Sequence, residues 1–177
     1  MSYWILQSNP SAFRILQCLE YLEHNDLQQD FWHVDRYYDE MKCGDIVFVW
    51  KSKDSPKLDN RGIYAKAKIL TEPKSFFVYE LEHVLEHDKT AIDKFEGMER
   101  IQKKYWVDLE KKGKVYQNPL IWVEYTKFLL DKPLLLADAQ VKSILSGSTI
   151  TGPVPRHVVH KLDQRQGRAL EQIMDSI

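Results

Sequence analysis

The residues best suited to bind a ligand are tryptophans that lie next to polar and basic positions. Five tryptophans occur in 177 residues, and Trp32 precedes His33, whereas Trp50 precedes Lys51 and Ser52. Two aromatic faces can hold a flat heterocycle, and stacking contributes about 1–3 kcal/mol per base. This pattern favours a pocket for a nucleobase. Packing of each tryptophan in the core is the alternative, because most strand tryptophans serve there.

Other kinds of chemistry have weaker support in the sequence. A glycine-rich phosphate loop, a Gly-x-Ser-x-Gly elbow and a His-Glu-x-x-His helix are all missing. His83 and His87 are four residues apart and would share a helix face, where they can bind a metal. A solvated face is the alternative, since the segment is acidic. Cys18 and Cys43 lack metal-ligand spacing. We therefore expect no catalytic residue, no metal and no cofactor.

The net charge of −1 conceals strong local differences. Two segments are basic: residues 51–68 and residues 100–114 each hold six Lys/Arg and two acidic residues. The segment between them is acidic, since residues 71–99 hold eight acidic residues and three Lys. Two basic segments that flank an acidic one predict a positive patch on one side of the fold. An ordinary solvated surface is the alternative interpretation.

Length and composition bound the class of protein. Residues 1–177 fit one domain, and contents of 44% hydrophobic and 29% charged residues are typical of a globular protein. No apolar run approaches the roughly 20 residues that cross a bilayer, and the N-terminus lacks the pattern of a secretory signal. We expect no membrane contact and a cytoplasmic location, which two unpaired thiols also fit.

The pattern of hydrophobic residues predicts short strands mixed with helices. Strands are expected over 3–7, 31–34, 46–50, 62–70, 105–109 and 121–125. Helices are expected from Pro10, from Asp138 to near Gly147 and from Pro155 onward, and a turn is expected over 111–114. His157 and His160 would lie on the last helix, where they face solvent or touch an anion. The expected strands and helices do not alternate regularly along the chain. Their order therefore favours an α+β fold around a small, mostly antiparallel sheet or barrel.

Several motifs occur together in an order that resembles the EVE-domain family of the PUA-like superfamily. They are Trp4 through Asn9-Pro10, Trp32-His33-Val34, Gly44-Asp45-Ile46-Val47-Phe48-Val49-Trp50, Gly62-Ile63-Tyr64-Ala65 and Ser146-Gly147-Ser148 before a C-terminal helix. The resemblance runs from about Tyr3 to Leu170. It implies a small β-barrel flanked by helices. Relatives, including YTH domains, read modified bases in RNA or DNA within an aromatic cage.

The resemblance also implies roles for particular residues. Trp32 and Trp50 would be the walls of the cage, and Asn9 and Ser52 would be polar contacts to the base. The loop from Lys51 to Arg61 is longer and more charged than the loop of the family, and it would approach the nucleic-acid backbone. The residues expected to contact that backbone are Arg36, Lys51, Lys53, Lys57 and Arg61.

The leading hypothesis is a non-enzymatic module that binds DNA or RNA and recognises a modified nucleobase. A metal-dependent hydrolase that uses His83, His87 and nearby carboxylates is a second hypothesis. A protein-interaction module, with its aromatic residues wholly in the core, is a third. The sequence predicts neither the identity of the base nor the oligomeric state.

Overall fold

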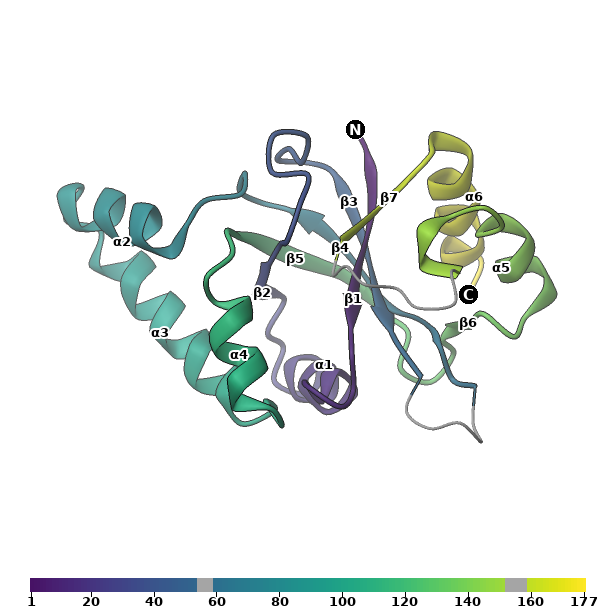
Figure 1. Ribbon diagram of the computed structural model, residues 1–177, viewed down its shortest axis with the longest axis horizontal. Helices are drawn as coiled ribbons and strands as arrows, with labels where there is room; N and C mark the ends of the chain where they lie inside the picture. The colour runs from purple at the N-terminus through teal and green to yellow at the C-terminus, as the bar shows by residue number, and fades with distance from the viewer. Residues whose placement is uncertain (54–58, 152–158) are drawn as a thin grey trace.

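The computed structural model describes residues 1–53, 59–151 and 159–177, and its centre is a mixed sheet curled into a half-barrel (Figure 1). The strands are β1 (Tyr3–Ser8), β2 (Gln29–His33), β3 (Ile46–Lys51), β4 (Gly62–Ile69), β5 (Leu120–Phe128), β6 (Leu134–Leu135) and β7 (Val159–Leu162). Their order is β2-β5-β4-β3-β1-β7, and β6 pairs with β4. Strands β1 and β3 are parallel, whereas the other pairings are antiparallel. The expected α+β fold around a mostly antiparallel half-barrel is confirmed.

Helices cover both faces of the sheet. They are α1 (Ile15–His24), α2 (Phe76–Leu85), α3 (Lys89–Lys103), α4 (Leu109–Val115), α5 (Ala139–Ile144) and α6 (Gln164–Asp175). Helices α2, α3 and α4 lie at one side of the molecule, with α2 at its outer end, and α5 and α6 lie at the opposite side (Figure 1). Among the described residues, no helix is long and apolar enough to span a bilayer.

Two hydrophobic clusters, one on each face, follow from the alternation of side chains along the strands. In β1, Trp4 and Leu6 belong to the cluster that α1 and α3 cover. The intervening Tyr3 and Ile5 belong to the cluster that α5 and α6 cover. Because both faces are buried, the central strands read as nearly continuous apolar runs.

The Gly44-Asp45 turn fixes the start of β3 beside β1. Gly44 has a φ of 91°, in the left-handed region that glycine tolerates. The buried Asp45 carboxylate accepts hydrogen bonds from Ser2 N at 2.7 Å, Lys42 N at 3.1 Å and Trp4 Nε1 at 2.9 Å. One side chain therefore joins the N-terminus, the turn and the core.

Two segments differ from the predicted elements. Residues 105–109 do not form a regular strand, because only an isolated bridge joins Trp106 to Phe13, and residues 111–114 lie within α4 rather than in a turn. The predicted helix start at Pro155 and His157 lie outside the described residues. His160 lies in β7, where it is 1% exposed, and not on a solvent-facing helix.

The predicted helix start at Asn9-Pro10 is also displaced. Helix α1 begins at Ile15, and Asn9 closes a turn in which its Oδ1 accepts from Ser11 N at 3.0 Å and from Ser11 Oγ at 2.9 Å. Asparagine stabilises such turns in the same way as it caps helices. The turn leaves Asn9 exposed at the end of β1.

Candidate functional site

A cavity of about 340 Å³ opens between the end of β1, strand β2, the C-terminal end of α3 and helix α4. Its lining residues differ in burial, which distinguishes a floor, walls and a rim. The floor is buried (Ser8, Asp30, Phe31, His33 and Gln102), the walls are mostly half-buried (Gln7, Ala12, Phe13, Trp32, Trp106 and Val115), and the rim is exposed (Asn9, Lys111 and Lys114). The cavity thus combines aromatic walls with a polar floor and a basic rim.

A buried hydrogen-bond chain sets the position of the Trp32 ring. Trp32 Nε1 donates to the Tyr125 hydroxyl at 3.1 Å, and that hydroxyl donates to Asp30 Oδ2 at 3.2 Å. Asp30 Oδ1 accepts from Phe31 N at 2.8 Å and from Gln102 Nε2 at 2.7 Å. Since a bonded indole N–H restricts rotation of the ring, the chain holds one aromatic wall in place.

The Asp30 carboxyl is 2% exposed, and burial raises its pKa to about 6. Hydrogen bonds from Gln102, Phe31 N and Tyr125 act in the opposite direction, because they favour the charged form. The removal of water outweighs them. A carboxylate on the floor is therefore held at a cost to stability.

His33 presents an acceptor on the floor. Its Nδ1 lies 2.9 Å from Asn118 O, and a carbonyl only accepts, so Nδ1 carries the proton. Burial lowers the pKa of His33, so the ring is neutral at pH 7 and Nε2 has a lone pair. The ring packs against Tyr116, with centroids 4.4 Å apart. Nε2 is buried and has no hydrogen-bond partner among the described residues.

Trp106 forms a second aromatic wall. It follows α3 and contacts Phe13, with ring centroids 5.1 Å apart and planes inclined by 58°. Its backbone forms a bridge with Phe13, and Arg14 N donates to Tyr105 O at 2.9 Å. These contacts attach the segment after α3 to the segment before α1. Within the described part of the chain, Trp106 Nε1 is buried without a partner.

The rim carries two exposed lysines. Lys111 lies 3.3 Å from Asp108, and Lys114 lies 2.7 Å from Glu110. Both pairs are on the surface of α4, where water and salt screen ion pairs and their net contribution is small, about 0–1 kcal/mol. The two ammonium groups can therefore exchange these partners for an anion at the mouth of the cavity.

The structure brings together only part of the predicted site. Trp32 and Asn9 both line the cavity, whereas Trp50 and Ser52 do not. Ser52 lies behind the wall, where its Oγ accepts from Gln7 Nε2 at 2.7 Å. The other end of the same amide is fixed, because Gln7 Oε1 lies 2.8 Å from His160 Nε2. Ser52 thus supports a lining residue instead of contacting the cavity.

The expectation that Trp50 faces Trp32 across a cage is not met. Trp50 is 1% exposed and packs with Phe48, Ile63 and other residues of the cluster beneath α5 and α6. The period of two in β3 places Trp50 and Phe48 on one face, but that face is covered by helices. The second tryptophan that lines the cavity is Trp106, from a distant segment.

The residues predicted to contact a nucleic-acid backbone do not line the cavity. Lys51 is 3% exposed, with Nζ 5.8 Å from the Tyr64 ring centroid, so it lies inside the protein and not on its surface. Arg36 Nε donates to Val159 O at 2.9 Å, which joins its loop to β7. The remaining three differ in their surroundings: Arg61 pairs with Asp59 at 2.6 Å, Lys53 is exposed, and Lys57 lies outside the described residues.

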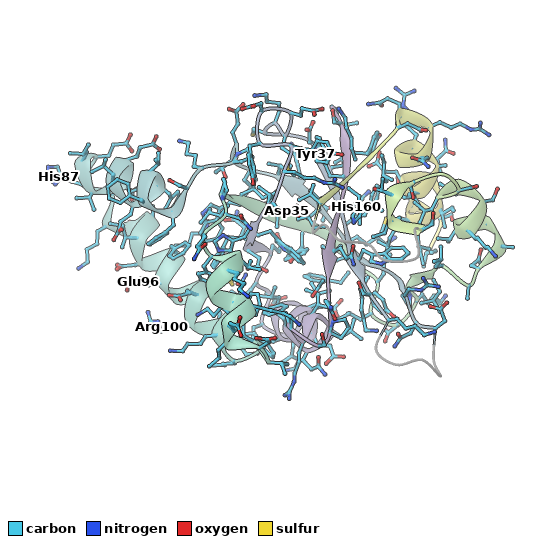
Figure 2. The ribbon with its side chains drawn as sticks, viewed as in Figure 1. Asp35, Tyr37, His87, Glu96, Arg100 and His160 are labelled. Atoms are coloured by element: carbon cyan, nitrogen blue, oxygen red, sulfur yellow. The ribbon has the colours of Figure 1, made fainter. Side chains whose placement is uncertain are left out.

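His83 and His87, the pair that the alternative hypothesis of a metal-dependent hydrolase uses, do not share a helix face. Helix α2 ends at Leu85, and His87 has a φ of 55° in the turn that follows. Figure 2 shows His87 at the outer end of the α2 and α3 pair, away from the sheet. Residues 1–53, 59–151 and 159–177 contain no group of three or more His, Cys, Asp or Glu side chains that could hold a metal.

Sequence reasoning missed Trp106, His33 Nε2, Lys111 and Lys114 as members of one site. The available signal was the basic segment 100–114 with Trp106 in its middle, an aromatic residue between cations. The prediction of a strand at 105–109 hid that signal, since it placed Trp106 in the sheet.

The fold and the site together define a mixed half-barrel with an aromatic-lined cavity beside the sheet. No protein-family model and no curated protein sequence matches the chain. Solved structures match it along nearly its whole length. A Pseudomonas putida protein gives a TM-score of 0.57 at 17% identity and covers 97% of this chain and 99% of its own. A Leishmania major protein gives 0.56 at 14% identity and covers 99% and 96%.

The human THYN1 protein, in complex with DNA that contains 5-methylcytosine, gives a TM-score of 0.53 at 16% identity and covers 98% of this chain and 97% of its own. At these identities the likeness establishes the fold. The small barrel flanked by helices that the motif resemblance implied is confirmed as the fold.

Proposed function

We propose that this protein is a non-enzymatic nucleic-acid-binding module that holds a modified nucleobase, extruded from its strand, in the cavity between Trp32 and Trp106. One observation carries the proposal: two tryptophans from distant segments line one cavity together with buried polar residues, and Lys111 and Lys114 lie at its exposed rim. A volume of about 340 Å³ is at the small end of ligand pockets, which suits a single base.

The partner is DNA in this proposal, and the support comes from the human THYN1 structure, whose DNA contains 5-methylcytosine. Each part of the cavity has a physical role. Aromatic walls stack on the base, which contributes about 1–3 kcal/mol and does not depend on its sequence. Lysines at the rim approach phosphates, so binding weakens as salt rises. A methyl group adds about 0.8 kcal/mol when buried, roughly a fourfold preference.

The proposal is tested by fluorescence anisotropy with single-stranded and duplex oligonucleotides at one salt concentration. Each oligonucleotide carries one cytosine, 5-methylcytosine, adenine or N6-methyladenine at a central position. We expect tighter binding to a methylated base than to its unmethylated counterpart. Equal binding of all four, or binding no stronger than to an oligonucleotide with an abasic central site, would contradict the proposal.

Substitution of the walls gives a sharper test. We expect Trp32→Ala and Trp106→Ala each to weaken binding by about 5- to 150-fold, which corresponds to the loss of one stacking face. The matched control is Phe77→Ala, since Phe77 is 70% exposed on α2, outside the cavity lining. Trp50→Phe separates the two possible cages: it should leave affinity unchanged, and a loss equal to that of Trp106→Ala would show that the cavity is not the site.

A further inference from the structure

We infer that the floor of the cavity selects bases whose amino group lies opposite the sugar, at C4 of a pyrimidine or C6 of a purine, and that His33 Nε2 accepts a hydrogen bond from this group. The ligand class is cytosine and adenine and their methylated forms, in preference to thymine, uracil and guanine. The inference rests on the proposed function, and it adds the chemical feature of the base that the site reads.

The first step is that the side-chain hydrogen-bond donors of the floor already have acceptors within the protein. Gln102 Nε2 donates to Asp30 Oδ1 at 2.7 Å and to Phe31 O at 2.8 Å, which engages both of its protons. Both partners are acceptors, so the amide orientation is fixed by its neighbours. The Ser8 hydroxyl points to Phe13 O at 3.5 Å. Asp30 is an acceptor when ionised.

The second step is that His33, a lining residue of the floor, has a buried acceptor that no described donor uses. Its only ring proton is on Nδ1, which faces Asn118 O, so Nε2 has a lone pair. His33 is 6% exposed and lines the cavity, and Nε2 is without a hydrogen-bond partner in the part of the chain that the structure describes. A buried acceptor without a donor costs about 1–3 kcal/mol, and a ligand N–H recovers that cost.

The third step is the direction in which a base enters. Its phosphates stay at the exposed rim, near Lys111 and Lys114, so the atoms farthest from the sugar reach the buried floor. In a pyrimidine, the position opposite the glycosidic nitrogen is C4, which carries an amino group in cytosine and a carbonyl in thymine and uracil. In a purine, C6 carries an amino group in adenine and a carbonyl in guanine. Amino groups donate and carbonyls accept, so a floor of acceptors favours the amino bases.

Trp106 Nε1 is one more donor without a described partner among the residues that line the cavity. It belongs to a half-buried residue of the wall and not to the floor. A donor in the wall is compatible with the ring edges of cytosine and adenine, which present acceptor nitrogens or oxygen. Its contribution is therefore compatible with an amino base, and its removal should leave the choice at the floor intact.

The test uses four oligonucleotides that differ only at one central base: cytosine, 5-methylcytosine, uracil and thymine. Thymine and 5-methylcytosine both carry the 5-methyl group, so their comparison isolates the group at C4, and the comparison of cytosine with uracil repeats it without the methyl. We expect anisotropy titrations to give at least about tenfold tighter binding to each amino base than to its carbonyl partner, since a matched contact to a base edge contributes about 1–3 kcal/mol.

The variant that assigns the effect is His33→Phe, which keeps a ring against Tyr116 and removes the acceptor. We expect it to bring both amino-to-carbonyl ratios close to one while the effect of the methyl group is unchanged. Trp106→Phe is the matched control and should retain the amino preference. Thermal melting verifies that each variant is folded, and if His33→Phe does not fold, the wild-type ratios still decide the selectivity.

Three results would refute, one by one, the selectivity for amino bases, the role of His33 and the proposed function. Equal binding of the amino and carbonyl bases, or tighter binding of thymine, would refute the inference and leave the proposed function standing. A preference that persists in folded His33→Phe would refute the role of His33. Failure of all four bases to bind better than an abasic oligonucleotide would refute the proposed function, and the inference with it.

Discussion

Replacement of Asp30 with asparagine tests whether burial or hydrogen bonding controls the charge on the floor of the cavity. Burial raises the pKa of Asp30 from 3.8 to about 6, although three donors contact the carboxylate. The folded protein therefore retains the proton over a pH range in which the unfolded chain has released it. Asparagine has a similar shape and no titrating proton, so Asp30→Asn removes this dependence.

The sign and size follow from linkage. Between about pH 4 and pH 6 the native state binds more protons at this site than the unfolded state, so the free energy of unfolding falls as pH rises. A shift of about two units corresponds to roughly 3 kcal/mol, at 1.36 kcal/mol per unit. The full cost is present above the folded pKa of about 6 and is absent below the unfolded value of 3.8.

Urea unfolding of the two proteins, followed by tryptophan fluorescence, gives the difference in free energy of unfolding at each pH. Other titrating groups cancel in that difference. We expect the variant to gain on the wild type by roughly 3 kcal/mol from pH 4 to pH 7. A constant offset from the altered hydrogen bond to Tyr125, about 1 kcal/mol, does not affect the slope. Parallel profiles would refute the shift, and a slope of opposite sign would show that the hydrogen bonds outweigh burial.

Two further predictions concern the frame that holds the site. In α6, a Cβ at position 167 would lie 2.0 Å from Tyr3 Cγ, so Gly167→Ala should lose up to about 2 kcal/mol net, whereas Gly97→Ala in α3, with no atom within 4 Å, should gain about 0.5–1 kcal/mol. Thermal melting checks the pair, and changes of the same sign would contradict the packing. Asp45→Ala should lose about 2–4 kcal/mol, because Ser2 N, Lys42 N and the buried Trp4 Nε1 lose their acceptor. Urea unfolding of Asp45→Ala beside Asp45→Asn measures it, and a loss below about 0.5 kcal/mol would show that water replaces the carboxylate.

Local signals in the sequence predicted those elements that local interactions form. The turn at Gly44-Asp45 leads into β3, and Asp138 caps α5 through bonds to Gln140 N and Val141 N. A positive φ and a capping side chain act within a few residues, so residue type and spacing indicate them directly. The motif resemblance implied a small barrel flanked by helices, and the structure has that fold.

Elements that depend on distant partners were predicted incorrectly. Val159 and Leu162 are spaced as on a helix, but the segment is strand β7, because it pairs with β1, where Val159 lies opposite Leu6. In the same way, Trp106 was assigned to a strand although it joins Phe13 only by an isolated bridge. Pairing with a strand more than a hundred residues away leaves no trace in a short window of sequence.

The sequence by itself determined the inventory of the site: stacking rings, buried polar groups and a basic segment in an α+β fold. Only the tertiary structure decided which of them meet. Trp50 lies near the end of a strand beside polar residues, as Trp32 does, yet α5 and α6 cover its face. Strand β2 is at the edge of the sheet, and its Trp32 lines a cavity that Trp106 also lines. The reason is geometric: alternation along a strand gives the two faces of a sheet, and only the packing of distant helices decides which positions stay open.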